Sequence, residues 1–111
     1  MMDVTPQRLK EELDKGTSFL IVDLQETEKY QHAHIPGAVN ISMETFREQY
    51  PAVLKDKAMS IVVYGEYDEL HKGSDAAAML EEAGYTRVGH VVGGLHGWQE
   101  AGYIVEGGWE S

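Results

Sequence analysis

Continuous apolar runs alternate along the chain with segments in which apolar residues recur at helical spacing. The two strongest runs, 19–24 (Phe-Leu-Ile-Val-Asp-Leu) and 61–64 (Ile-Val-Val-Tyr), are each followed by polar residues. Runs of this length are typical of strands that are covered on both faces, as in a parallel sheet. Further strands are predicted at 38–41 and 88–92. The pattern therefore predicts four strands in one sheet.

Helices are predicted before, between and after these strands. The first begins at Thr5, which can cap it, has Pro6 at its first position and ends at Gly16. A second helix carries Phe46 and Tyr50, with Ser42 as a cap and Pro51 as its end. Two further helices are predicted from Gly73 or Ser74 to Ala83 and from Gly93-Gly94 to Gly102. Alternation of strands and helices predicts an α/β fold, a parallel sheet with helices on both faces.

Length and charge narrow the class of protein. The 111 residues are sufficient for one domain, 1–111, whose Gly- and Glu-rich tail, 106–111, is expected to be frayed. With 9 basic and 19 acidic residues the net charge is −10, which argues against binding to nucleic acid or to an anionic membrane surface. No apolar run exceeds five residues and no secretory signal is apparent, so we expect a cytoplasmic protein.

The chain contains no cysteine, which excludes disulfides, thiolate metal sites and a cysteine nucleophile. Ligands of parallel sheets bind beyond the carboxyl ends of the strands, and the first N–H groups of the following helix can bind an anion. The loop 65–72, which follows a strand and precedes a helix, is therefore the predicted functional site. Its candidate binding residues are Glu66, Tyr67, Asp68, Glu69, Leu70, His71, Lys72 and Gly73.

Four segments resemble the signatures of rhodanese-like sulfurtransferase domains. They are 23–30 followed by 34–41 (His-Ile-Pro-Gly-Ala-Val-Asn-Ile), the strand 61–64, the helix with Ala76-Ala77, Leu80 and Gly84, and 93–98 (Gly-Gly-Leu-His-Gly-Trp) followed by Ala101-Gly102. They occur in the family's order between about Val4 and Val105. The resemblance implies the family's fold, a five-stranded parallel sheet flanked by helices on both faces.

The resemblance also implies a chemistry that this chain lacks. The family's thiolate, on a cysteine directly after the Val-Val-Tyr strand, attacks a sulfane sulfur, commonly that of thiosulfate, and holds it as a persulfide. That position is Gly65 here. The family's usual arginine and serine correspond to Lys72 and Gly73 in a loop two residues longer than the common form, and the arginine of its Asp-x-Arg motif corresponds to Gln25. We therefore expect a catalytically inactive relative with a vestigial nucleophile position.

No side chain near the loop replaces the thiol, because Ser74, Tyr67 and His71 cannot form a persulfide. Three acidic side chains and one lysine give the loop a formal charge of −2 with its histidine neutral. One like-charge contact near 4 Å costs about 1 kcal/mol in water and about 4 kcal/mol at an effective dielectric constant near 20. A helix N-terminus offsets only about 0.3–1 kcal/mol, so a thiosulfate dianion would be repelled unless the acids point outward.

Three functions are consistent with these observations. The first is a non-catalytic binding or regulatory module, whose acidic loop with Tyr67 binds a basic segment of a partner protein. The second is a thiosulfate-type sulfurtransferase whose cysteine has been substituted or is supplied by a partner. The third is a metal-binding protein based on His32-x-His34, although the resemblance implies a structural role for His34 and no third ligand is evident. No cofactor is expected, and Asp23 is expected to organise the turn after its strand.

Overall fold

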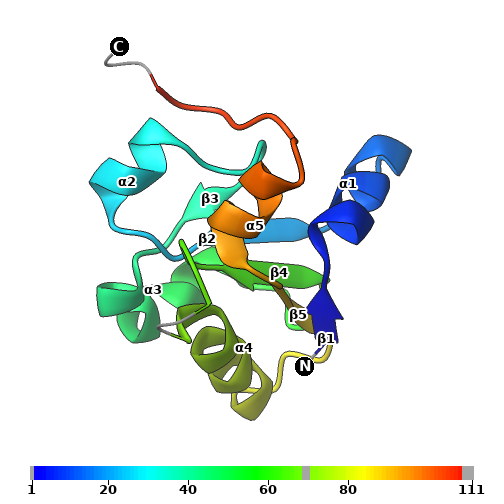
Figure 1. Cartoon of the computed structure of the whole chain (residues 1–111). Helices are drawn as coiled ribbons and strands as arrows, with labels where there is room; N and C mark the ends of the chain where they lie inside the picture. The colour runs from blue at the N-terminus through cyan, green and yellow to red at the C-terminus, as the bar shows by residue number, and fades with distance from the viewer. Residues whose placement is uncertain (1, 69–70, 109–111) are drawn as a thin grey trace.

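The computed structural model describes residues 2–68 and 71–108. Five parallel strands form one sheet, in the order β1 (Met2–Val4), β5 (Val88–Val91), β4 (Ile61–Tyr64), β2 (Leu20–Asp23) and β3 (Val39–Asn40). Figure 1 shows β4 and β2 in the middle of the sheet, which fits their continuous apolar sequences. The predicted α/β fold with a five-stranded parallel sheet is confirmed.

Helices cover both faces of this sheet (Figure 1). They are α1 (Pro6–Lys15), α2 (Thr27–His32), the 3-10 turn η1 (Met43–Thr45), α3 (Phe46–Val53), α4 (Lys72–Glu82) and α5 (Gly94–Glu100). The buried side chains of α3 and α4 share one apolar cluster, and those of α1 and α5 share another. None of the helices in the described ranges has the length and apolar character that a membrane crossing requires.

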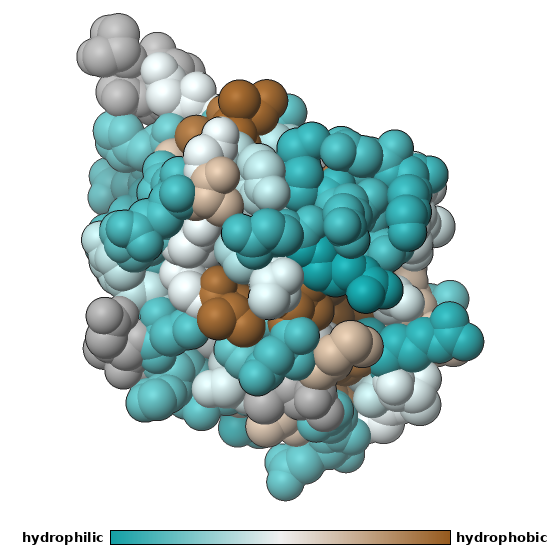
Figure 2. All heavy atoms as spheres, turned by 45° about the vertical axis from the view of Figure 1, so that its right-hand side comes forward, coloured by the Kyte–Doolittle hydropathy of each residue, from teal (hydrophilic) through white to brown (hydrophobic). Residues whose placement is uncertain are grey.

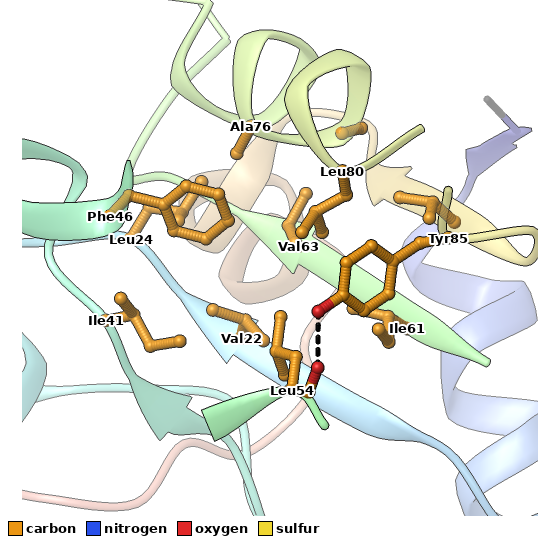
Figure 3. Close-up of a cluster of buried hydrophobic side chains, with 12 residues drawn as sticks. Val22, Leu24, Ile41, Phe46, Leu54, Ile61, Val63, Ala76, Leu80 and Tyr85 are labelled. Carbon is orange, nitrogen blue, oxygen red and sulfur yellow. Dashed lines mark hydrogen bonds between the residues drawn. The ribbon is translucent and has the colours of Figure 1, made fainter. Parts of the chain in front are cut away.

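The cluster beneath α3 and α4 is built mainly from aliphatic side chains (Figure 3). Phe46 of α3 and Leu80 of α4 pack over Val63 of β4, and all three side chains are fully buried. The hydroxyl of Tyr85 donates a hydrogen bond to the carbonyl oxygen of Leu54 at the edge of this cluster. Burial on this scale holds α4, and with it the end of the preceding loop, against the sheet.

The second cluster places α1 and α5 on the opposite face. Leu9 of α1 and Trp98 of α5 are both buried there. The predicted ends of α1 are confirmed, since the Thr5 hydroxyl accepts a hydrogen bond from the Arg8 N–H at 3.1 Å and Gly16 adopts a left-handed φ of 75°.

The face that carries β1 and α1 is mostly hydrophilic, with apolar surface gathered across its middle (Figure 2). A hollow of about 260 Å³ lies between these two elements, and Val4, Leu9 and Val62 contribute to its lining. Arg8 also lines it, but its guanidinium pairs with Glu12 at 3.1 Å. This hollow therefore offers no unpaired arginine to a ligand.

Besides helix α2, which the pattern did not predict, and the start of α4, the structure differs from the sequence pattern in three places. The first is β1, which the pattern did not predict because three residues carry no periodicity. The strand forms by pairing with β5. Met2 to Val4 pair with Gly89 to Val91, and the Val92 N–H donates to the Val4 carbonyl at 2.9 Å.

The second difference concerns the helix predicted to end at Pro51. Helix α3 contains Pro51 and continues to Val53, because the Leu54 N–H donates to the Tyr50 carbonyl at 2.7 Å and the Leu54 side chain is buried. The missing N–H of the proline therefore leaves one bond unmade without ending the helix. The proposed cap, Ser42, makes no side-chain capping bond.

The third difference concerns the tail, which was expected to be frayed over 106–111. Glu106 forms a two-way backbone bridge with His34, at 2.9 Å in each direction, and Gly108 N–H donates to the Gln31 carbonyl at 3.1 Å. Backbone hydrogen bonds therefore fix residues 106–108 against α2 and the turn that follows it. Residues 109–111 lie outside the described residues.

Candidate functional site

Gly65 lies directly after β4 and is buried at the carboxyl end of that strand. A Cβ atom at this position would lie 3.3 Å from Cβ and 3.7 Å from Cδ of Lys72. The stem of Lys72, at the start of α4, therefore packs where the side chain of a nucleophile would begin. A small side chain at 65 would require Lys72 to shift by a few tenths of an ångström.

The start of α5 is attached to the backbone of the loop. The carbonyl oxygens of Gly65 and Glu66 accept hydrogen bonds from the N–H groups of Leu95 at 2.9 Å and His96 at 3.0 Å. Gly94 has a φ of 60°, and a Cβ on it would lie 2.3 Å from the Gly65 carbonyl oxygen. Only glycine permits this close approach, so the sequence Gly93-Gly94 reflects packing of α5 against the loop.

The two described acids of the loop have different partners. The Glu66 carboxylate pairs with Lys29 of α2 at 3.0 Å, and this hydrogen bond raises the pKa of the lysine. The Asp68 carboxylate instead accepts a hydrogen bond from the Gly93 N–H at 2.7 Å. Within residues 2–68 and 71–108, no basic side chain pairs with Asp68. The loop therefore presents one neutralised acid and one acid without a counter-ion.

His71 closes the loop in a left-handed conformation, with φ 56°, immediately before α4. Its N–H donates to the Asp68 carbonyl at 2.9 Å, and its own carbonyl accepts bonds from the Ser74 hydroxyl at 3.2 Å and the Asp75 N–H at 2.9 Å. Helix α4 consequently begins at Lys72, slightly earlier than predicted. The candidates Glu69 and Leu70 lie outside the described residues.

Two adjoining hollows open beside this loop and share Asp68 and His71. One of about 390 Å³ is lined by Tyr67, Asp68, His71, Gly93 and His96, and one of about 280 Å³ by Asp68, His71, Gly73, Ser74 and His90. The structure thus brings together Tyr67, Asp68, His71 and Gly73 among the predicted site residues, whereas Glu66 and Lys72 line neither hollow.

The candidate residues did not include four lining residues, Ser74, which directly follows the predicted stretch, and His90, Gly93 and His96 from β5 and the segment after it. The available signal was the predicted parallel sheet, although the sequence did not show which strands are neighbours; the structure places β5 beside β4. In a parallel sheet the residues at and after the carboxyl end of β5 must lie beside the loop that follows β4. The ring of Tyr67, which is 45% exposed, lies with its centroid 5.1 Å from that of His96.

The end of β2 carries a different polar cluster, centred on Asp23. One carboxylate oxygen accepts the Gln25 backbone N–H at 2.7 Å, and the other accepts the Gln25 side-chain amide at 2.8 Å and the Tyr64 hydroxyl. Burial raises the pKa of Asp23 against the opposing effect of these bonds, and burial beside that carboxylate also raises the pKa of Tyr64. These bonds confirm that Asp23 organises the turn after its strand.

His34 has hydrogen-bond and ring contacts that agree with the structural role implied by the resemblance. Its Nδ1 lies 2.8 Å from the Tyr30 carbonyl oxygen, and its ring stacks on Tyr30 with centroids 4.0 Å apart. Its Nε2 is 3.6 Å from the Glu106 carboxylate. In the parts of the chain that the structure describes, no three histidine, aspartate or glutamate side chains are arranged to hold a metal ion.

Comparisons with known proteins agree with this architecture. The rhodanese-like domain family matches residues 5–101. The thiosulfate sulfurtransferase GlpE of Actinobacillus succinogenes is 26% identical over 104 residues, covering 94% of this chain and 89% of GlpE. YrkF of Bacillus subtilis is 27% identical over 97 residues; the match covers 86% of this chain and 50% of YrkF. The solution structure of the rhodanese-like domain of Anabaena Alr3790 has a TM-score of 0.87 and 31% identity, covering all of this chain and 83% of that one.

Proposed function

Because this chain belongs to the rhodanese-like domain family, we propose that it is a non-catalytic member that binds a partner protein through the loop after β4. Its relatives include a protein named thiosulfate sulfurtransferase. The resemblance assigns the sulfur-accepting thiol of such enzymes to the residue directly after β4. In this chain that residue is Gly65, and no cysteine occurs elsewhere in the 111 residues.

The observation that carries the proposal is the environment of Gly65. Cβ of Lys72 lies 3.3 Å from the position that a Cβ on residue 65 would take, and the Gly65 carbonyl accepts a hydrogen bond from the Leu95 N–H at 2.9 Å. A nucleophile at 65 would have to displace Lys72 by a few tenths of an ångström. The approach of Lys72 to a position without a side chain supports a loop that is used for its surface.

The charges of the loop favour a basic partner segment. Asp68 has no counter-ion within residues 2–68 and 71–108, and Tyr67 offers an exposed aromatic face beside it. An anion such as thiosulfate would meet these acids, whereas a basic segment is attracted to them. The partner contact would involve the described residues Glu66, Tyr67, Asp68, His71, Lys72 and Gly73 together with Glu69 and Leu70 of the same loop.

A transfer assay tests the loss of catalysis. Purified protein is incubated with thiosulfate and cyanide, and thiocyanate is measured beside an active thiosulfate sulfurtransferase as the positive control. We expect no thiocyanate above the rate without protein. Steady turnover by the chain alone would contradict the proposal, and turnover only after addition of a second protein would show that a partner supplies the thiol.

A second experiment tests the loop as the binding surface. Partners captured by the wild-type protein are compared with those captured by a variant in which Glu66, Asp68 and Glu69 are changed to Gln, Asn and Gln. We expect specific partners to be lost, while a control with Glu11, Glu48 and Glu81 changed to Gln retains them. The two variants have the same net charge, so retention of every partner by the loop variant would count against the proposal.

A further inference from the structure

We propose that the larger hollow beside the loop binds the side chain of a single arginine from the partner protein. This inference rests on the binding role proposed above and names the group that the loop recognises. The hollow has a volume of about 390 Å³ and is lined by Tyr67, Asp68, His71, Gly93 and His96. Its lining combines one carboxylate with the aromatic rings of Tyr67, His71 and His96.

The carboxylate of Asp68 is fixed in position but not neutralised. One of its oxygens accepts the Gly93 N–H at 2.7 Å, which holds the group at the edge of both hollows. Its neighbour Glu66 shows the alternative arrangement, an acid already paired with Lys29 at 3.0 Å. In the described part of the chain Asp68 has no such cation, so a basic group from outside can supply one.

The rings of Tyr67 and His96 provide the second contribution. Their centroids lie 5.1 Å apart at an interplanar angle of 47°, and 45% of Tyr67 is exposed. An exposed aromatic face beside a carboxylate is a favourable place for an organic cation, because the ring attracts the positive charge that the acid neutralises. The carboxylate of Asp68 and the ring of Tyr67 therefore both favour a cation.

The geometry favours arginine over lysine. A guanidinium group is planar, stacks on aromatic faces and donates several hydrogen bonds to a carboxylate, while an ammonium is compact and strongly hydrated. Lys72, the lysine at the start of α4, does not line this hollow, and its stem packs over Gly65. The hollow is thus open to a cation from another molecule.

The test is a titration of the full chain, labelled with nitrogen-15, with three blocked pentapeptides. The peptides are identical except for a central arginine, lysine or citrulline, the last being a neutral analogue of arginine. We expect the arginine peptide to shift the Gly93 amide signal saturably, and the citrulline peptide to bind about tenfold more weakly or not at all. The lysine peptide should bind with an intermediate affinity.

Variants locate the site. Asp68→Asn keeps an acceptor for the Gly93 N–H and should weaken arginine binding about tenfold, and Tyr67→Ala should weaken it about threefold. Glu11→Gln, which changes the net charge by the same amount on α1, should leave the affinity within about twofold. Equal binding of arginine and citrulline, tighter binding of lysine, or an equal loss in Glu11→Gln would each overturn the inference.

The two proposals fail in distinguishable ways. Absence of a saturable shift in a protein that also transfers no sulfur would overturn the arginine site alone. Transfer of sulfur from thiosulfate would overturn the non-catalytic function, whatever the peptides do.

Discussion

Two neighbouring strands of the sheet, β2 and β4, end in polar segments that are built differently. At the end of β2, Asp23 is fully buried and receives hydrogen bonds from Gln25 and Tyr64. At the end of β4, Gly65 is followed by Glu66 and by the exposed residues Tyr67 and Asp68, and no basic side chain within residues 2–68 and 71–108 pairs with Asp68. The first segment is held by buried hydrogen bonds, and the second forms a loop at the position where the resemblance places the family's nucleophile. The comparison shows that the family's fold is compatible with a glycine at that position.

The largest effect is expected where the loop and α5 meet. Gly94→Ala should lower the free energy of unfolding by about 4 kcal/mol, because the new Cβ would lie 2.3 Å from the Gly65 carbonyl oxygen. Gly102→Ala is the matched control, since its φ is 87° and nothing lies within 4 Å of its Cβ. That change should cost only the backbone strain, about 1–2 kcal/mol in urea denaturation. Equal losses would show that packing against the loop contributes nothing.

A smaller effect is expected at the buried end of β2. Tyr64→Phe removes a donor to Asp23 and the acceptor of the Ile35 N–H at 3.0 Å, so we expect a loss of about 3 kcal/mol. The same change in the loop, Tyr67→Phe, should alter the free energy of unfolding by less than about 0.5 kcal/mol. Urea denaturation of both variants measures the contrast. Similar losses in both would mean that the two strand ends are equally structural.

The pH dependence of the free energy of unfolding tests how deeply the end of β2 is buried. Burial raises the pKa of Asp23 in the folded chain above that of an unfolded aspartate, about 3.9. Between these two pKa values the folded state binds more protons than the unfolded state. The contribution of Asp23 to the free energy of unfolding therefore falls as pH rises through this window and is constant above it.

Comparison with Asp23→Asn isolates this contribution from that of the other acids. The difference in unfolding free energy, wild type minus variant, should decrease with rising pH in urea denaturation. A difference that increases with pH would mean that the hydrogen bonds to the carboxylate outweigh its burial.

A small effect on stability is also expected at Gly65. In Gly65→Cys the new Cβ would lie 3.3 Å from Cβ of Lys72, which must shift by a few tenths of an ångström, so stability should change by less than about 1 kcal/mol. We nevertheless expect little thiosulfate-to-cyanide transfer, because the loop is acidic and its length and arginine position also differ from the family's. Turnover at the rate of an active relative would show that the loop has stayed competent.

Sequence patterns predicted the parts of the molecule that depend on local rules. The continuous apolar runs predicted β2 and β4. The capping residue Thr5 and the glycine at position 16 predicted the two ends of α1. The edge strand β1 was not predicted, because three residues become a strand only through pairing with β5. Tertiary contacts of this kind override local propensity.

The candidate site was predicted in position but not in detail. Its place after β4 followed from the geometry of parallel sheets. The contact of Lys72 with Gly65 and the bond from Gly93 to Asp68 each join residues that are separated along the chain, and no local pattern encodes them. His96 was not predicted as a site residue either, because it lies far from the loop along the chain.

The most direct test of the central claim is the intact mass of the purified chain after incubation with thiosulfate and removal of excess reagent. The account predicts a mass unchanged from that of the untreated protein, since no residue of the sequence can retain a sulfane sulfur. A stable gain equal to one sulfur atom, mapped by fragmentation to a side chain of the loop, would contradict it.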